Sequence, residues 1–261
     1  MRTQEKRATR FRSIQTSLLF VIVPAVIISM AVLSLMGYLS SKAIIQTSAG
    51  TEMSQCLSVA MGSIEMSLSN NRMVAETMAR GVEAVQRQAV KGEQTASDWD
   101  AAAYQEILTS FVGSNPETFG GGIWFEPYQY RPEQRYFSPY CMRQNGAVTY
   151  VDNYSLGEGV YYTDQDWYTN AANTTQKSVW SAPYYDEFAQ ISMVTSSAPI
   201  YDETGRLLGV ATADIDLTQM QQMVLSLDVV ANGRAFLIDD TGVYIADEGQ
   251  REAPVRQHIG G

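Results

Sequence analysis

The stretch VTSSAPIYDETGRLLGVATADIDL, Val194–Leu217, decides the fold. Two runs rich in β-branched and apolar residues flank the polar segment DETG, whose Thr204-Gly205 pair is typical of a turn. The segments QISMVTSSAPIYD and LLGVATADIDL therefore predict an antiparallel hairpin. The second run is almost wholly apolar, which predicts a strand buried inside a sheet.

Further strand patterns precede this hairpin. FGGGIWFEP, residues 119–127, predicts a buried strand that opens with glycines. QRYFSPYCMR and QNGAVTYVD predict strands on either side of an Asn145-Gly146 turn. DQDWYTNA, residues 164–171, predicts a short helix for which Asp164 or Asp166 serves as N-cap or first-turn acid.

Two elements follow the hairpin. DLTQMQQMVLSL predicts a helix capped by Asp216 or Thr218, and GRAFLIDDTGVYIAD predicts a second, smaller hairpin. The polar ending EAPVRQHIGG does not complete this β unit. We therefore expect the chain to be part of a longer protein.

The N-terminal region predicts a membrane anchor. No charged residue occurs from Ser13 to Ser41, and residues 17–36 read SLLFVIVPAVIISMAVLSLM. Twenty residues at helical rise span roughly 30 Å, the thickness of a bilayer's hydrocarbon core. A cleavable signal peptide is the alternative, but its apolar region would cover only about 7–15 residues. We expect a transmembrane helix over residues 15–41.

Charge sets the expected orientation. Five basic residues precede the apolar run and only Lys42 follows it, so residues 1–14 are expected in the cytoplasm and residues after about 42 outside the membrane. Residues 43–261 carry 12 basic and 27 acidic side chains, a net charge of −15. This charge disfavours nucleic acid as a partner.

A long helix is expected directly after the anchor, over residues 42–92. Its apolar residues recur at three- and four-residue steps, at positions that include Met53, Leu57, Ile64, Leu68 and Met78. Such a helix suggests a stalk that packs against a second copy of the chain in a homodimer. The alternative is that the apolar stripe covers the chain's own domain, and both can hold along different parts.

The expected fold class is α+β. TASDWDAAAYQEILTSFVGSN predicts a second helix with Ser97 as N-cap and Trp99 on its apolar face. The antiparallel sheet and its short helices form a module over residues 93–230, and residues 231–261 begin a second, smaller module. Cys56 and Cys141 are expected to be unpaired, because nothing in their spacing suggests a disulfide.

The motifs between Asp166 and Leu217 resemble the double Cache sensor domains of bacterial transmembrane receptors. These motifs are Trp167-Tyr168 opening a short helix, a W-x-x-P-Y strand entry from Trp180, and the hairpin from Thr195 to Ile215. The likeness covers about residues 44–250. The N-terminal helix is similar to the first membrane helix of methyl-accepting chemotaxis receptors.

The resemblance implies a sensor whose membrane-distal, PAS-like sheet holds a small ligand. It identifies the sensing module better than the signalling activity to which that module is coupled. Histidine kinases, diguanylate cyclases and phosphatases carry similar sensors, and a structural surface protein with the same scaffold is a further alternative. Amino-acid-binding members place an Arg two residues before the Trp, where this chain has Gln165. The family's late aspartate, which accepts a ligand ammonium, corresponds to Asp214.

The region from Tyr140 to Tyr185 is rich in aromatic and acidic side chains and holds one lysine, Lys177. Aromatic faces attract cations and a carboxylate neutralises them. This composition suits an amine, another small polar metabolite is the alternative, and a scaffold without a small ligand is the third possibility. The candidate ligand-binding residues are Asp214, Tyr168, Trp167, Asp166, Tyr162, Trp180, Tyr184, Asp186 and Trp124.

Catalysis is not expected within this chain. Asp164 and Asp166 are two residues apart at one helix start, so they do not bracket a substrate from opposite sides. The chain has one histidine, His258, and no catalytic motif of the G-x-S-x-G or H-E-x-x-H kind. We therefore expect no catalytic residues, no metal site and no cofactor.

Overall fold

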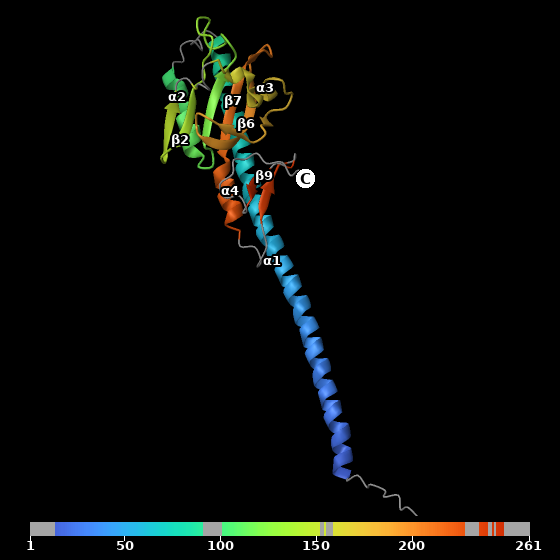
Figure 1. Ribbon diagram of the computed structural model, residues 1–261. Helices are drawn as coiled ribbons and strands as arrows, with labels where there is room; N and C mark the ends of the chain where they lie inside the picture. Colours follow the sequence, from blue (N-terminus) through green and yellow to red (C-terminus); the bar gives the residue numbers. More distant parts are fainter. Residues whose placement is uncertain are drawn as a thin grey trace, which may run out of the picture. The chain divides into compact units, whose positions relative to one another are not determined.

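The computed structural model describes the helical N-terminal region and most of the sheet domain (Figure 1). The described residues are 14–90, 101–151, 154, 159–227, 235–239, 242 and 244–247. The chain divides into two compact units, Met1–Gln55 and Cys56–Gly261. Ser97 and Trp99 lie outside the described residues, so the predicted cap of the second helix is not among them.

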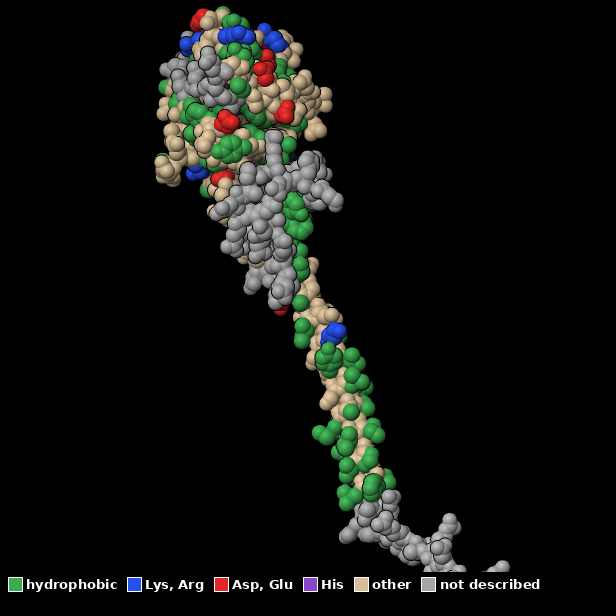
Figure 2. All heavy atoms as spheres, viewed as in Figure 1, with side chains coloured by type: hydrophobic (Ala, Val, Ile, Leu, Met, Phe, Trp, Pro, Cys, Tyr) green, Lys and Arg blue, Asp and Glu red, His purple; other side chains and the backbone are tan. Residues whose placement is uncertain are grey.

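Helix α1 runs from Ile14 to Val90 and contains Pro24. Within the first unit its large apolar side chains are exposed, and Figure 2 shows them along this part of the helix. The most apolar 18-residue window has a mean hydropathy of 2.8. By its length and composition this part of α1 is suited to cross a membrane.

Within the second unit, α1 covers the chain's own domain. From Ala60 onward one stripe of the helix is buried, and Ala75 and Ala79 are completely inaccessible. Outside this stripe, Leu57, Met61 and other large apolar side chains remain exposed. The prediction that the apolar stripe of α1 covers the chain's own domain is therefore confirmed for this part of the helix. Packing against a second copy of the chain stays a prediction.

The sheet is antiparallel, and β7 lies near its centre. The strand order is β3-β2-β1-β7-β6-β4, with β5 also paired to β6. The bounds are β1 Gly120–Phe125, β2 Tyr140–Gln144, β3 Ala147–Val151, β4 Val179–Trp180, β5 Tyr184–Asp186, β6 Ile191–Tyr201 and β7 Leu207–Asp216. The predicted strands and the α+β class are confirmed.

The two faces of this sheet bury different kinds of side chain. One face packs against α1 and α2 (Ala101–Ser114) through an aliphatic and aromatic core that includes Met78, Leu108 and Ile123. The other face carries a second core, rich in Trp and Tyr, beneath α3 (Asp166–Ala172). Side chains alternate between the faces along each strand. On β7, for example, Ala211 and Ala213 face α1 and α2, while Val210 faces the aromatic core.

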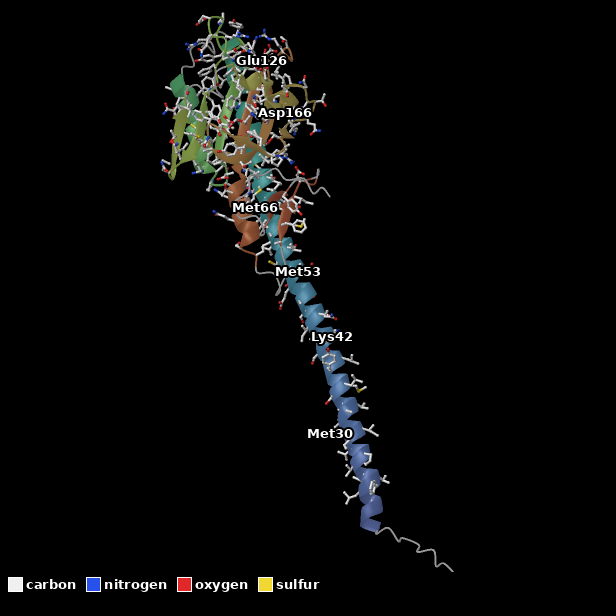
Figure 3. The ribbon with its side chains drawn as sticks, viewed as in Figure 1. Met30, Lys42, Met53, Met66, Glu126 and Asp166 are labelled. Carbon is white, nitrogen blue, oxygen red and sulfur yellow. The ribbon has the colours of Figure 1, made fainter. Side chains whose placement is uncertain are left out.

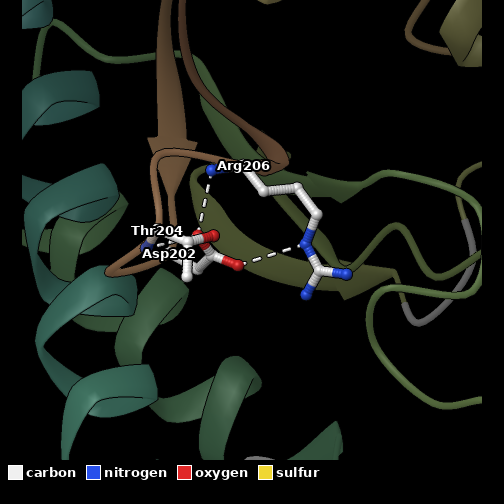
Figure 4. A network of polar contacts seen from close by, with 3 residues as sticks. All are labelled: Asp202, Thr204 and Arg206. Carbon is white, nitrogen blue, oxygen red and sulfur yellow. Dashed lines mark hydrogen bonds and ion pairs between the residues drawn. The ribbon is translucent and has the colours of Figure 1, made fainter.

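The predicted turns are confirmed. Asn145 and Gly146 both have positive φ, as a two-residue hairpin turn of this kind requires. Between β6 and β7, the carboxylate of Asp202 accepts hydrogen bonds from Thr204 and Arg206 (Figure 4). The Thr204 hydroxyl contributes most to lowering the pKa of Asp202 to about 2. The hydrogen bonds of the turn therefore stabilise the ionised form of this carboxylate.

At the start of α3 the predicted first-turn acid is confirmed as Asp166, and the prediction of an acidic N-cap is wrong. The N-cap of α3 is Gln165, and no side chain caps that helix. Asp164 instead ends a short 3-10 helix, η2 (Tyr162–Asp164), and Asp166 is the first-turn acid of α3. Two short helical segments in succession replace the one helix start that the sequence suggested, so neither acid occupies the capping position.

The remaining elements agree with their predictions. Asp216 caps α4 (Leu217–Leu225) by accepting the Thr218 backbone N–H at 2.8 Å. Strands β8 (Phe236–Ile238) and β9 (Tyr244–Asp247) pair antiparallel as the second hairpin. Cys56 and Cys141 are both free.

Arg143, on β2, is expected to be an important stabilising residue. Its guanidinium donates to the carbonyls of Val112, Asn115 and Thr118 at the end of α2. Arg143→Met should lower the free energy of unfolding by about 3 kcal/mol, because it removes three charge-assisted bonds. Thermal unfolding of the purified chain in detergent micelles measures this loss.

The matched control is Arg206→Met. Arg206 makes a surface ion pair with Asp202, and its side chain is 63% exposed. Surface pairs contribute at most about 1 kcal/mol. Equal losses in the two variants would contradict the role given to Arg143.

Candidate functional site

A small cavity lies on the aromatic face of the sheet. It offers about 10 Å³ to the centre of a water molecule, which is room for roughly one water. Its walls come from β1, β2, α3, β5, β6, β7 and the segment before η2. The lining residues are Trp124, Tyr140, Tyr154, Trp167, Tyr184, Asp186, Met193, Thr195, Thr212 and Asp214.

Asp214 is a buried acid in this cavity, and each of its carboxylate oxygens has a hydrogen-bond partner. Its side chain is 3% exposed, and it lies on β7 directly opposite Gly120 of β1 and Thr195 of β6. The Tyr140 hydroxyl donates to one carboxylate oxygen and the Thr195 hydroxyl to the other, both at 2.7 Å. Because the Thr195 hydrogen is used in this way, the Tyr184 hydroxyl donates to Thr195, at 2.8 Å.

Glycines in β1 make the bond from Tyr140 to Asp214 possible. Tyr140 pairs with Gly122 across the sheet, so its ring must pass over Gly120 to reach Asp214. A Cβ atom on Gly120 would overlap the Tyr140 hydroxyl, and one on Gly122 would lie 2.9 Å from its ring. Because the glycines of the GGG motif have no side chains, the Tyr140 ring has room to lie against β1.

A second buried carboxylate, Asp186, lines the same cavity. It is 5% exposed and accepts hydrogen bonds from the Tyr154 hydroxyl at 2.5 Å and the Ala189 backbone N–H at 2.7 Å. No Lys or Arg is among the residues that line the cavity. The site therefore places two acids among aromatic rings, with neutral donors as their partners in the described structure.

Burial changes the ionisation of these groups. Desolvation, with a smaller contribution from the nearby Asp186, raises the pKa of Asp214 to about 7, against the opposing effect of its bonds from Tyr140 and Thr195. Desolvation also raises the pKa of Tyr140, Tyr154 and Tyr184. The tyrosines therefore stay protonated as donors, while Asp214 changes charge near neutral pH.

Five of the nine candidate residues meet at the cavity. They are Trp124, Trp167, Tyr184, Asp186 and Asp214. Trp124 also donates from its indole nitrogen to Thr212 at 2.8 Å, which holds the ring against the sheet. The rings of Trp124 and Trp167 have centroids 4.8 Å apart and form one continuous aromatic wall.

The structure does not bring the other four candidates to the cavity. The Tyr162 hydroxyl donates to the Phe125 carbonyl at 2.6 Å, and the Tyr168 hydroxyl to Glu126 at 2.7 Å. Asp166 is exposed at the first turn of α3 (Figure 3). Trp180 lines a separate groove beside α1. Their roles in ligand binding stay predictions that this conformation does not favour.

Five lining residues were not among the candidates: Tyr140, Tyr154, Met193, Thr195 and Thr212. Strand alternation identifies Thr212, since it lies two residues before Asp214 on the same face of β7. Hairpin register identifies Thr195 as the cross-strand partner of Asp214. Tyr140 and Tyr154 belong to the tyrosine-rich region, but the pattern alone does not separate them from its other tyrosines.

Tyr140→Phe is expected to move the titration of Asp214 upward. The hydroxyl stabilises the ionised carboxylate, so its removal raises the pKa of Asp214 further above the usual range. The pH at which Asp214 ceases to affect stability should therefore rise. Unfolding temperatures measured from pH 4 to pH 9 would show this shift, whereas Tyr185→Phe, on an exposed tyrosine, should leave the profile unchanged. Superimposable profiles for Tyr140→Phe and the unmodified protein would contradict the assigned bond.

Comparison with known proteins shows that the sheet domain is similar to parts of methyl-accepting chemotaxis proteins. Residues 104–222 match the family model described as the methyl-accepting chemotaxis protein-like, first PDC sensor domain. Among curated proteins, McpC of Bacillus subtilis is 38% identical over 84 residues, 32% of this chain. McpA of Pseudomonas putida is 26% identical over 199 residues, 74% of this chain. Both carry the name methyl-accepting chemotaxis protein, and the matches span 13% and 30% of their lengths.

Solved structures share the fold. The ligand-binding domain of the Campylobacter jejuni chemoreceptor Tlp3, in complex with 4-methylisoleucine, aligns with a TM-score of 0.55 at 17% identity. The alignment covers 78% of this chain and 72% of that one. The same receptor domain in complex with L-valine aligns with a TM-score of 0.54. At this identity the likeness establishes the fold.

Proposed function

Because residues 104–222 match the model of the first PDC sensor domain of methyl-accepting chemotaxis protein-like receptors, we propose that this chain is the ligand-sensing, extracytoplasmic part of a bacterial transmembrane chemoreceptor. In this proposal the apolar part of α1 anchors the receptor in the cell membrane. The proposed division is a cytoplasmic segment 1–14, a membrane helix 15–41, a stalk 42–92, a membrane-distal sensor module 93–230, and the start of a membrane-proximal module 231–261.

The proposed ligand is a small molecule with a protonated amine. The observation that supports this most strongly is Asp214, a buried carboxylate in a cavity with aromatic walls and no basic lining residue. A cation there would gain an ion pair and contacts with aromatic faces, each worth about 0.5–2 kcal/mol. It would also relieve the repulsion between Asp214 and Asp186.

An amine fits these walls better than a zwitterion. The titles of the Tlp3 structures name amino acids, which carry an ammonium group and a carboxylate. In this chain Gln165 bonds weakly to its own helical segment, through the Tyr161 carbonyl at 3.4 Å, and it does not line the cavity. The cavity therefore has a carboxylate for an ammonium and no Arg or Lys for a ligand carboxylate.

Ligand entry requires a change of conformation, since the cavity has room for roughly one water. A conformation with its aromatic walls apart would bind the ligand better than the closed one, and this difference in affinity is what shifts an equilibrium. Because α1 packs on the opposite face of the same sheet, we infer that opening changes how α1 packs in a homodimer of the receptor.

Calorimetric titration of the full chain in lipid nanodiscs at pH 8 tests the ligand class. The compounds are butylamine, 1,4-diaminobutane, L-valine and succinate. Saturable binding of an amine that Asp214→Asn removes is the expected result. Binding of anionic compounds alone, or amine binding that is unchanged in Asp214→Asn, would contradict the proposal.

A further inference from the structure

A second recess lies away from the aromatic cavity, between α1 and the segment that leads into β4. It is an open groove of about 470 Å³, and this volume falls within the range of small-molecule sites. Its walls are Arg72 and Glu76 from α1, and residues 176–180 from the β4 side. It shares no lining residue with the aromatic cavity.

The charges in this groove are opposite to those in the cavity. Arg72 and Lys177 both line it, and neither has an ion-pair partner within the part of the chain that the structure describes. Arg72 and Glu76 stand four residues apart on α1, a spacing at which Arg and Glu commonly pair. Here the Glu76 carboxylate instead accepts the Ser178 hydroxyl at 2.6 Å, which ties α1 to the β4 segment. Arg72 is therefore left available.

Trp180 also contributes to the groove wall. The indole nitrogen of Trp180 is buried and has no hydrogen-bond partner in the described structure. A buried donor of this kind is uncommon in folded proteins, because leaving it unpaired is unfavourable. The groove thus offers a guanidinium and an ammonium, whereas the Trp180 indole nitrogen is closed off from solvent, and its one acid is already bonded.

We propose that this groove binds a small dianion, such as a dicarboxylate or a phosphate, between Arg72 of α1 and Lys177 beside β4. Guanidinium matches the two oxygens of a carboxylate or phosphate group in a bidentate way, and the lysine ammonium adds a second point charge. The bound dianion would join α1 to the β4 segment next to the existing Glu76–Ser178 contact. The proposed receptor would then have two input sites of opposite charge preference with no lining residue in common.

The test uses the full chain in lipid nanodiscs at low ionic strength, with inorganic phosphate and succinate as separate probes. Saturable binding of either probe, with chloride at the same ionic strength as the baseline, is the expected result. Arg72→Gln combined with Lys177→Gln should weaken that binding at least tenfold. Glu76→Gln should tighten it several-fold, because it removes the negative charge from the groove.

Two controls separate this site from the rest of the protein. Arg206→Gln removes an exposed positive charge outside the groove and should leave the affinity unchanged. The unfolding temperature of each variant without probe shows that it is folded. Absence of saturable binding of both probes up to about 10 mM, or equal affinity in the Arg72/Lys177 double variant, would overturn the proposal. Neither result would affect amine binding at Asp214, so the two sites can fail independently.

Discussion

Asp214→Asn is expected to weaken the binding of an amine by more than about 100-fold while the protein stays folded. Removing one partner of a buried ion pair costs about 3–5 kcal/mol, because the remaining charge stays buried without compensation. Asn keeps the shape of the side chain and can still interact with the Tyr140 and Thr195 hydroxyls. Calorimetric titration at pH 8, where Asp214 is mostly ionised, measures the loss.

The matched control for this variant is Asp164→Asn. Asp164 is exposed at the end of η2 and does not line the cavity. Removing its charge changes the net charge of the domain by the same amount as Asp214→Asn. An equal loss of affinity in both variants would show that long-range attraction, and not the buried carboxylate, holds the amine.

Asp214→Asn has a second expected effect, on the pH dependence of the free energy of unfolding. Burial raises the pKa of Asp214 from the usual range of an aspartate, near 4, to about 7. Between these values the folded protein keeps a proton that the unfolded chain has released, so the free energy of unfolding falls as the pH rises. The contribution of Asp214 to this fall is at most about 4 kcal/mol. Asp214→Asn should flatten the unfolding-temperature profile between pH 4 and pH 7.

The affinity for an amine should increase as the pH rises, whereas the free energy of unfolding decreases. Below pH 7 the ligand must displace the proton from Asp214 before it can pair with the carboxylate. Affinity should therefore fall by about tenfold for each pH unit below 7, as linkage requires for one proton. A flat affinity profile from pH 5 to pH 8 would exclude Asp214 as the ammonium partner.

Gly209→Ala has the largest expected effect on folding. Gly209 lies on β7 opposite Phe125 of β1, and a Cβ atom there would overlap the Trp124 carbonyl oxygen and lie 2.9 Å from the Phe125 Cα. These atoms belong to a paired backbone, so they cannot move without breaking hydrogen bonds in the centre of the sheet. We expect a loss of about 3 kcal/mol or more in the free energy of unfolding.

Gly81→Ala is the control for this substitution. Gly81 lies on the exposed side of α1, and a Cβ atom there meets nothing within 4 Å. Alanine in an exposed helical position should stabilise the protein by up to about 1 kcal/mol. Thermal unfolding in detergent micelles should therefore shift in opposite directions for the two glycines. A Gly209→Ala variant as stable as the unmodified protein would contradict the close approach of β1 and β7.

Local patterns predicted the fold well because each element is specified by a few neighbouring residues. The hairpin of β6 and β7 follows from apolar runs around a Thr-Gly turn, and the Asn145-Gly146 turn from two residues that tolerate positive φ. The α3 cap could not be predicted in the same way. Both Asp164 and Asp166 suit a helix start, and the choice of Gln165 depends on the preceding 3-10 helix.

The site was only partly predictable because it is assembled across strands. Asp214 is recognisable as a carboxylate on an otherwise apolar strand, and the cost of burying it suggests a role. Tyr140 reaches it only through a cross-strand register that no local pattern encodes. Trp167 and Tyr168 are neighbours on α3, yet Trp167 faces the cavity and the Tyr168 hydroxyl bonds to Glu126. That difference depends on the rotation of a seven-residue helix.

The glycines of β1 also have a consequence for how the proposed ligand site can diversify. Because Gly120 and Gly122 add no side chains, the Tyr140 ring from β2 takes up the space above this part of β1. Substitutions on β2 could thus change the space available to the proposed ligand, without changes to the central strands. A smaller residue at position 140 would deepen the cavity and admit bulkier ligands, while alanine at Gly120 would displace the ring and narrow it. If the cavity binds the proposed ligand, single substitutions on β2 would change the range of ligands while the hydrogen-bonded ladder of the sheet stays intact.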